Sequence, residues 1–252
     1  MVALAAERGL AAIAITDHDT VEGVAEAAEA GAPLGVEVVP GVEISSLFGR
    51  HEPHILGLFV DVSNPQLLAM LERLREDRLR RARLIVGKLQ ALGLDVTVDQ
   101  VLQRSGPGSV GRMHIAQVIS EGGYSSTVQD AFARYIGRRG TAFVDRNAPP
   151  TRSAIDAVVA AGGVPVLAHP GHLRLDSEIP SWASWGLKGL EALHTDHSPE
   201  QAKRYKEMAR KLGIIATGGS DCHGYAKSEP ILGSVSVPYS VVEELRRASG
   251  KA

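Results

Sequence analysis

Short apolar runs bordered by histidine and acidic residues constrain this chain more than any other feature. They lie at 11–16, 36–44, 54–60, 164–168 and 214–218. The runs are continuous and rich in β-branched residues, which is typical of strands buried on both faces of a parallel sheet. In an α/β barrel, the side chains that carry chemistry lie at the carboxyl ends of such strands. The bordering residues therefore predict a cluster of nitrogen and oxygen donors suited to Zn, Mn or Fe ions.

Helical segments separate the apolar runs. We expect helices at 20–30, 151–161, 178–185, 198–212 and 239–248, and one more strand at 187–193. Strands that alternate with helices favour a parallel α/β sheet.

A long helix is expected from Asn64-Pro65 to about Leu92, because Asn is a good helix cap and Pro is favoured at the first helical position. Shorter helices are expected over 98–139. We therefore predict a barrel made of residues 1–63 and 146–252, interrupted by a helical insertion over 64–145.

Composition excludes several classes of protein. The chain has 252 residues, a formal net charge of −2 and one cysteine. The small charge excludes non-specific polyanion binding as the main activity. One cysteine excludes an internal disulfide and fits a reducing compartment. We find no apolar run of about 18 residues and no signal peptide, so we expect a cytoplasmic enzyme with no membrane span. Nothing in the sequence indicates an obligate protein partner.

Six motifs occur in order along almost the whole chain. They are Thr16-Asp17-His18-Asp19-Thr20, Gly41-Val42-Glu43-Ile44-Ser45, His54-Ile55-Leu56-Gly57, Gly111-Arg112-Met113-His114-Ile115-Ala116, Ala168-His169-Pro170 and Gly219-Ser220-Asp221-Cys222-His223-Gly224. Together they resemble the PHP family, named for polymerases and histidinol phosphatases. Within it, the chain most resembles the stand-alone 3′,5′-nucleoside bisphosphate phosphatases and 5′→3′ exoribonucleases. The resemblance implies a distorted (β/α)7-type barrel that hydrolyses phosphate esters of nucleotides or short RNA.

The resemblance also implies a centre of up to three divalent metal ions, manganese first, with iron or zinc as alternatives. The implied metal ligands are His18, Glu43, His54, His169, Asp221 and His223. All of these except His54 are also expected to be catalytic. A carboxylate has two oxygens, so Glu43 can bridge two ions. Independently of the family, the Asp-x-His spacing on an extended segment projects Asp221 and His223 to the same side.

The sequence departs from the family pattern at its start. Members of the family open with a His-x-His pair and a Ser-Asp-Gly turn, and this sequence has neither. We expect the barrel's first strand to be missing, as part of a segment of about twenty residues. The chain as given should then bind fewer ions and be less active than a longer form, and strand 11–16 should have an open edge.

Arg112 and His114 fall in the predicted insertion, where no metal pattern needs them. A guanidinium fork suits phosphate recognition, and the resemblance places both residues over the substrate phosphate. The alternative is a surface helix start with a chance histidine. The arginine-rich stretch 72–83 is interleaved with acidic residues and is more typical of a solvated, salt-bridged face.

Further polar residues lie close to the motifs. Asp19 is expected to cap a helix or to hold a metal ligand in place by hydrogen bonding, rather than to bind a metal ion itself. His194 is a candidate for lining the site, and His172 lies near it without an assigned role. His197 is expected at the surface, and Cys222 is expected in the core.

The chemistry that the resemblance implies is attack of a metal-activated water on phosphorus, with the ions neutralising the phosphoryl oxygens. Three alternatives remain open. One is a histidinol-phosphate phosphatase, which shares this chemistry. Another is an amidohydrolase, which also places His and Asp at strand ends. The third is a metal-deficient binding or structural module, which the absent His-x-His pair favours.

Overall fold

The computed structural model describes residues 1–106, 108–224 and 229–251. The chain divides into two compact units. One comprises Met1–Met70 and Pro149–Ala252, and contains all the strands that the structure describes; the other comprises Leu71–Ala148 and is helical. Within the described residues, no helix combines the length and the apolar character that a bilayer crossing requires.

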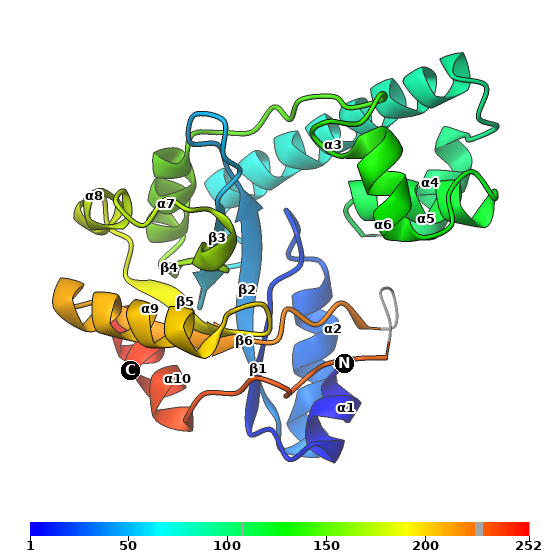
Figure 1. Ribbon diagram of the computed structural model, residues 1–252. Coiled ribbons are helices and arrows are strands. Elements are labelled where there is room, and N and C mark those ends of the chain that lie inside the picture. The colour runs from blue at the N-terminus through cyan, green and yellow to red at the C-terminus, as the bar shows by residue number, and fades with distance from the viewer. Residues whose placement is uncertain (107, 225–228, 252) are drawn as a thin grey trace. The chain divides into compact units, whose positions relative to one another are not determined.

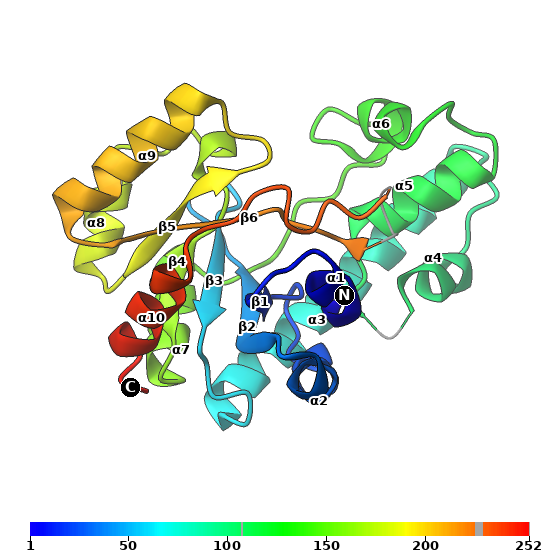
Figure 2. The same cartoon turned by 90° about the horizontal axis from the view of Figure 1, so that it is seen from below.

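A six-stranded sheet organises the first unit (Figure 1). Its strands are β1 (Ala12–Ile15), β2 (Glu37–Ser45), β3 (His54–Leu58), β4 (Val164–Leu167), β5 (Gly189–His194) and β6 (Ile215–Gly219). Their order in the sheet is their order in the chain, and β2 is the one described strand that pairs with β1. The sheet is curled into a half-barrel (Figure 2), which confirms the predicted α/β class with a distorted barrel.

The expectation that every strand is parallel is wrong for β3. This strand runs antiparallel to both β2 and β4, whereas the pairs β1–β2, β4–β5 and β5–β6 are parallel. The reason lies in the connection 46–53, which is too short for a parallel crossover of a dozen or more residues. Reversal brings the start of β3 to the edge where β2 ends, and His54 pairs with Ser45.

The concave face of the sheet changes from apolar to polar along the strands. Its apolar part is a cluster of buried residues: Val39, Leu56, Leu58, Phe59, Val164, Val166, Ala168 and Leu245. Leu245 comes from α10 (Tyr239–Ala248), which covers this part. Because side chains alternate along a strand, Glu43 and His54 share the face of Leu56. The polar end of this face therefore holds potential ligands above an apolar floor.

Helix α10 is tied to the sheet by polar contacts as well. Glu37, at the start of β2, accepts hydrogen bonds from the Tyr239 hydroxyl at 2.6 Å and from the Arg246 guanidinium at 2.5 Å. The Lys251 ammonium donates to the carbonyl of Phe59 at 2.6 Å. These contacts fix the helix that covers the apolar floor.

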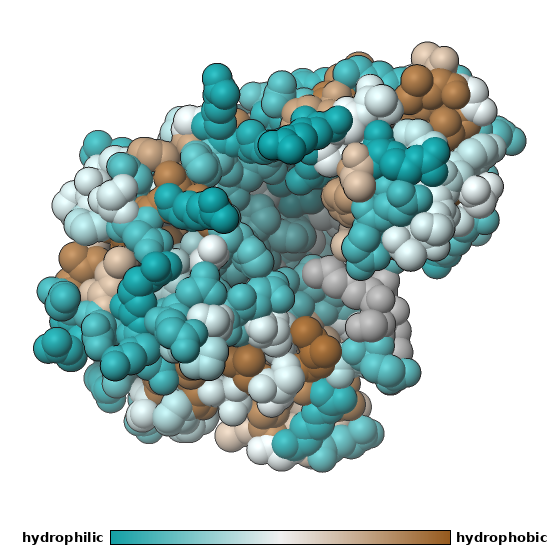
Figure 3. All heavy atoms as spheres, in the orientation of Figure 1, coloured by the Kyte–Doolittle hydropathy of each residue, from teal (hydrophilic) through white to brown (hydrophobic). Residues whose placement is uncertain are grey.

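Other helices cover the convex face. Helix α2 (Gly23–Gly31) packs on β1 and β2, α7 (Thr151–Ala160) on β3 and β4, and α9 (Pro199–Leu212) on β5 and β6. Short α1 (Val2–Glu7) packs against α2, and the shorter helices η1 (Ala32–Leu34), η3 (Pro170–His172) and α8 (Ile179–Ser184) lie in connections. Side chains in the region of α9 are mostly hydrophilic on the surface (Figure 3). Helices thus pack on both faces of the sheet, and the polar end of the face that α10 partly covers remains for the site.

The second unit has its own core. Its helices are α3 (Pro65–Ala91), which begins in the first unit, α4 (Val98–Ser105), α5 (Arg112–Glu121), α6 (Val128–Ala131) and η2 (Phe132–Ile136). The Asn64 side chain accepts hydrogen bonds from the backbone N–H groups of Gln66 and Leu67, as expected of a cap. Buried Ile85, Leu89 and Ile119 lie in the core of this unit.

Candidate metal centre

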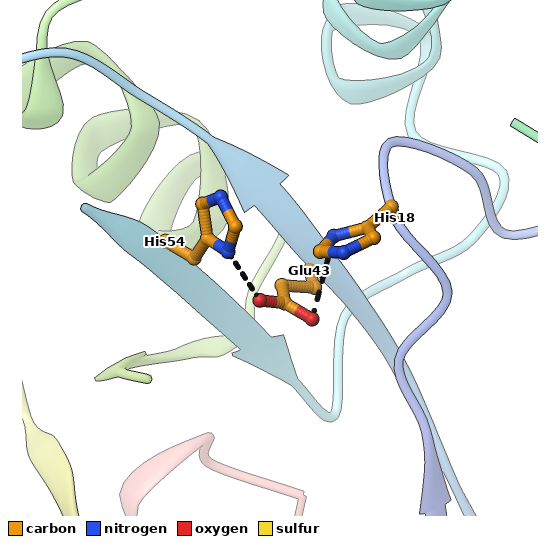
Figure 4. A group of neighbouring side chains, drawn as sticks. All are labelled: His18, Glu43 and His54. Carbon is orange, nitrogen blue, oxygen red and sulfur yellow. Dashed lines mark hydrogen bonds and ion pairs between the residues drawn. The ribbon is translucent and has the colours of Figure 1, made fainter. Parts of the chain in front are cut away.

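Glu43 lies at the centre of the candidate site. Its side chain, 7% exposed, comes from β2 and is surrounded by three imidazoles. Its Oε1 lies 2.6 Å from His54 Nδ1 and 3.2 Å from His169 Nε2, and its Oε2 lies 3.4 Å from His18 Nδ1. Figure 4 shows His18 and His54 approaching the two carboxylate oxygens from opposite sides. A single buried carboxylate therefore joins segments from three parts of the chain.

His18 is placed by backbone pairing that continues beyond β1. The Glu43 N–H donates to the carbonyl of Asp17 at 3.1 Å, and the Asp19 N–H donates to the carbonyl of Glu43 at 3.0 Å. These bonds form an isolated parallel bridge between His18 and Glu43. The imidazole of His18 is thereby held beside the carboxylate.

Asp19 holds the segment that carries His18 against strand β2. Its side chain is fully buried, and its two oxygens accept hydrogen bonds from Ser45 N at 2.8 Å and Ser45 Oγ at 2.9 Å. Asp19 adopts φ 55°, a left-handed conformation that Asp tolerates better than most residues. The expected supporting role of Asp19 agrees with these contacts.

His169 follows β4 in a strained backbone conformation. Its φ is 30°, and Pro170 follows it. Its backbone N–H donates to Glu191 Oε2 at 2.8 Å. Its ring Nδ1 is buried and has no hydrogen-bond partner in the described part of the chain. The ring therefore presents Nε2 to Glu43 and retains a nitrogen whose partner the described residues do not supply.

Asp221 and His223 reach the same edge after β6. His223 Nδ1 lies 3.6 Å from Asp221 Oδ1, and the ring centroids of His18 and His223 are 6.3 Å apart. The ring centroid of His54 lies 5.0 Å from that of His18 and 5.2 Å from that of His169. The structure thus brings together all six residues that the motifs singled out as ligands.

Charge interactions shift the pKa values at this site. Burial raises the pKa of Glu43, but the charges of His18 and His54, with hydrogen bonds from His169 and His54, outweigh it and hold that pKa well below its usual range. Burial also lowers the pKa of His169, but the hydrogen bond and charge of Glu43 reverse the effect and raise it. Glu43 is therefore a carboxylate at neutral pH, the state in which it can bind a cation.

The donor set fits a divalent cation. One ligand atom from each of His18, Glu43 and His54 lies within 4.8 Å of the others. Ligands of a tetrahedral ion at 2.0–2.1 Å are separated by about 3.4 Å, close to the 3.4 Å and 3.2 Å that separate Glu43 oxygens from His18 and His169. Half-buried imidazoles gathered around one buried carboxylate are a donor set that such ions favour.

Glu191 was missed by the sequence reasoning. It lies within β5, is buried, and faces the same site through His169. Burial raises its pKa to about 7, and the charges of Glu43 and Asp221 add to this, against the lowering effect of the His169 N–H and charge. The sequence did carry a signal for it, because Glu191 is a lone acidic residue in the strand expected at 187–193. A buried charge needs a partner, so such a residue indicates a polar contact inside the fold.

A row of histidines continues beyond His169. The ring centroids of His172 and His194 each lie 5.7 Å from that of His169, and the centroid of His197 lies 5.4 Å from that of His194. His197, expected at the surface, is half-buried against Tyr205. Cys222, expected in the core, is half-exposed, because it lies in an irregular segment after β6 rather than in a strand.

Arg112 and His114 occupy the first turn of α5 in the helical unit. His114 Nδ1 accepts a hydrogen bond from the Gly111 N–H at 3.1 Å, which completes the helix cap. The Arg112 guanidinium carbon lies 5.8 Å from the centroid of the Phe132 ring. These contacts leave the expected phosphate contact of both residues as a prediction.

Comparisons with known proteins give a consistent set of relatives, although no protein-family model matches the chain. The chain is 33% identical to a 3′,5′-nucleoside bisphosphate phosphatase of Chromobacterium violaceum, over 87% of this chain and 79% of that protein. It is 32% identical to the 5′-3′ exoribonuclease Rnm of Escherichia coli, over 88% of this chain and 78% of that protein.

Solved structures agree with these relatives. A Bifidobacterium adolescentis protein, described as a metal-dependent phosphoesterase, superposes with a TM-score of 0.90 at 34% identity, covering 98% of this chain and 89% of that one. A Chromobacterium violaceum protein, described as an amidohydrolase with bound sulfate and no metal, superposes with a TM-score of 0.87 at 31% identity and with the same coverage.

Proposed function

The chain belongs to the PHP family of metal-dependent phosphoesterases, and we propose that it hydrolyses phosphate esters of nucleotides or short RNA. The observation that carries this proposal is the meeting of His18, His54 and His169 around the buried carboxylate of Glu43. Relatives that act on nucleoside bisphosphates and on RNA support the substrate class.

We assign divalent-cation binding to His18, Glu43, His54, His169, Asp221 and His223. Cations bound there supply positive charge for the phosphoryl oxygens and lower the pKa of a water molecule. Manganese is the proposed ion, since mixed nitrogen and oxygen donors accept it along with iron and zinc. We also place the enzyme in the cytoplasm, in keeping with its single cysteine.

The residues of the chain itself position this centre. Glu43 stays ionised because facing imidazoles lower its pKa, so it holds three histidines and balances cationic charge. Asp19 fixes the end of the loop that carries His18 through its bonds to Ser45. Glu191 fixes the backbone of His169. Such preorganised groups do not have to reorganise when charge develops in the transition state.

We propose that Arg112 and His114 bind a substrate phosphate. Both lie in the first turn of α5, where backbone N–H groups and the helix dipole favour an anion. The planar guanidinium of Arg112 can donate two parallel hydrogen bonds to a phosphate, which a lysine cannot.

Phosphate release from three substrates tests the proposal. The purified chain, loaded with Mn²⁺, would be given a 3′,5′-nucleoside bisphosphate, a short 5′-phosphorylated RNA and histidinol phosphate. We expect turnover of the bisphosphate or the RNA, and its loss in Glu43→Gln. Turnover of histidinol phosphate alone would indicate that the protein is a histidinol-phosphate phosphatase instead. No turnover of any of them, with metal bound, would overturn the proposal.

A further inference from the structure

A second group of metal-binding side chains lies beside the Glu43 site and shares no residue with it. It consists of His172, from η3, His194, at the end of β5, and Asp196, in the turn after β5; we call it the His172 cluster. One ligand atom from each residue lies within 4.8 Å of the other two. None of the six motif residues belongs to this cluster.

The distances in the His172 cluster suit a single small cation. Asp196 Oδ2 lies 3.1 Å from His172 Nε2 and 3.8 Å from His194 Nδ1. These two separations bracket the value of about 3.4 Å between ligands of a tetrahedral ion with bonds of 2.0–2.1 Å. Small side-chain adjustments would therefore place two imidazole nitrogens and one carboxylate oxygen around one ion.

His194 gives the cluster a rigid and incompletely paired member. Its side chain is 1% exposed, and its Nε2 has no hydrogen-bond partner among the residues that the structure describes. Its Nδ1, the ring atom that lies toward Asp196 Oδ2, accepts the Asp196 N–H at 3.2 Å, and an ion bound by Nδ1 would replace that hydrogen bond. A buried imidazole nitrogen without a hydrogen-bond partner is unfavourable. The single hydrogen bond that the structure gives the His194 ring is therefore the one from the Asp196 N–H, within the described part of the chain.

The other two members are open to solvent. The side chains of His172 and Asp196 are 53% and 58% exposed. A cation can reach them directly, and water can fill the remaining coordination position. A plain surface pair of histidine and aspartate would explain the 3.1 Å contact between them, but not the buried His194 beside it.

We propose that the His172 cluster is a further divalent-cation site, with two imidazoles and one carboxylate, that takes Zn²⁺ or an ion of similar preference. Imidazole ligands favour zinc and later transition metals over magnesium or calcium. The ring centroids of His172 and His194 lie 5.7 Å from that of His169, so an ion here adds positive charge next to the Glu43 site.

Zinc counting in the Glu43→Gln background tests this site separately from the proposed activity. The whole chain carrying Glu43→Gln would be equilibrated with Zn²⁺, and bound zinc would be measured by elemental analysis. We expect one equivalent that disappears when His172→Ala and Asp196→Ala are added. Both replaced residues are exposed, so folding, checked by circular dichroism, should be retained. His51→Ala, at an exposed histidine outside the cluster, is the matched control and should keep the equivalent.

Cobalt provides a second readout that does not depend on catalysis. Co²⁺ bound by two imidazoles and a carboxylate in a tetrahedral site gives visible absorption bands, and these should be lost with His172→Ala and Asp196→Ala. At least tenfold weaker Zn²⁺ binding in that variant is the expected result. Equal zinc content and an unchanged cobalt spectrum with and without the two substitutions would overturn the proposal. Loss of phosphate release would bear on the Glu43 site and leave this result intact.

Discussion

The buried carboxylate of Glu191 accepts a 2.8 Å hydrogen bond from the backbone N–H of His169. His169 has φ 30°, in a region that is costly for a residue with a Cβ. The acceptor on β5 helps to hold the backbone there, and the ring then reaches Glu43 with Nε2 at 3.2 Å from Oε1. Glu191, which need not touch a metal ion, thus orients His169, which we propose as a metal ligand.

Glu191 should make the stability of the metal-free protein fall as pH rises. Burial raises its folded pKa to about 7, above the ordinary value of 4.5. Between these values the folded state binds more protons than the unfolded state, so stability is highest below the lower value and declines until pH passes the higher one. The contribution is about 3 kcal/mol at most. Urea unfolding of the wild type and Glu191→Gln at several pH values would measure it, and the glutamine variant should lack this decline. Identical pH dependence of the two proteins would show that Glu191 does not titrate as described.

Glu43→Gln should abolish most metal binding at the central site. The amide keeps the shape of the side chain but loses the charge that faces His18, His54 and His169. Loss of groups that merely orient metal ligands already costs 10–100-fold, so we expect phosphate release to fall by about 100-fold or more. Metal content and kcat/KM would be measured together. Glu29→Gln, at an exposed glutamate of α2, should behave as wild type; full activity in Glu43→Gln would refute the assignment.

Substitution of Asp19 should destabilise the protein and disturb His18. Asp19→Ala removes the buried acceptor of both Ser45 bonds, at a cost of about 3 kcal/mol. Asp19→Asn should cost less, since asparagine also tolerates a positive φ and retains an acceptor oxygen. Chemical denaturation would rank the three proteins. Asp156→Ala, at an exposed aspartate, serves as the control, and an Asp19→Ala protein as stable as this control would contradict the prediction.

Substitution of Arg112 should lower the rate of substrate hydrolysis without changing the metal content of the protein. If its guanidinium binds phosphate, Arg112→Lys should lose nearly as much transition-state stabilisation as Arg112→Ala, about 2–3 kcal/mol. Both variants lose the planar pair of N–H donors that can bind two phosphate oxygens at once. We would compare kcat/KM for a 3′,5′-bisphosphate with that for a substrate lacking the second phosphate.

A drop on both substrates would place Arg112 at the phosphate that is cleaved, and a drop on the bisphosphate alone would place it at the neighbouring one. Metal content should stay constant in both variants. Arg83→Ala, at an exposed arginine of α3, controls for the loss of charge. Unchanged kinetics in Arg112→Ala would return Arg112 to the role of a surface residue packed on Phe132.

The strands and the positions of the candidate ligands along them could be predicted because both depend on local pattern. Apolar β-branched runs define where strands occur; Glu43 lies within one of them, and His18 and His169 follow two others in the chain. The cap at Asn64 was equally predictable, since a side chain that accepts from the next N–H groups is a local device.

The direction of β3 and the role of Glu191 could not be predicted in the same way. Strand β3 is buried along most of its length, like a typical parallel strand, so only the short connection 46–53 indicates that it is antiparallel. Glu191 acts on His169 through pairing between β4 and β5, a contact set by tertiary structure. His172, which follows the turn at His169, meets His194 of β5 across the fold, with ring centroids 6.2 Å apart.

The antiparallel β3–β4 ladder has a consequence for how this protein assembles. Other neighbouring strands are close in the chain, but residues 59–163 separate β3 from β4. Closing a longer loop costs more entropy, and folding of the helical segment first shortens the flexible chain that must be closed. Pulsed hydrogen exchange should therefore find the amides that join β3 to β4 protected after those of α3, α4 and α5. The sheet that carries the candidate ligands is then completed only when the interrupting helices have formed.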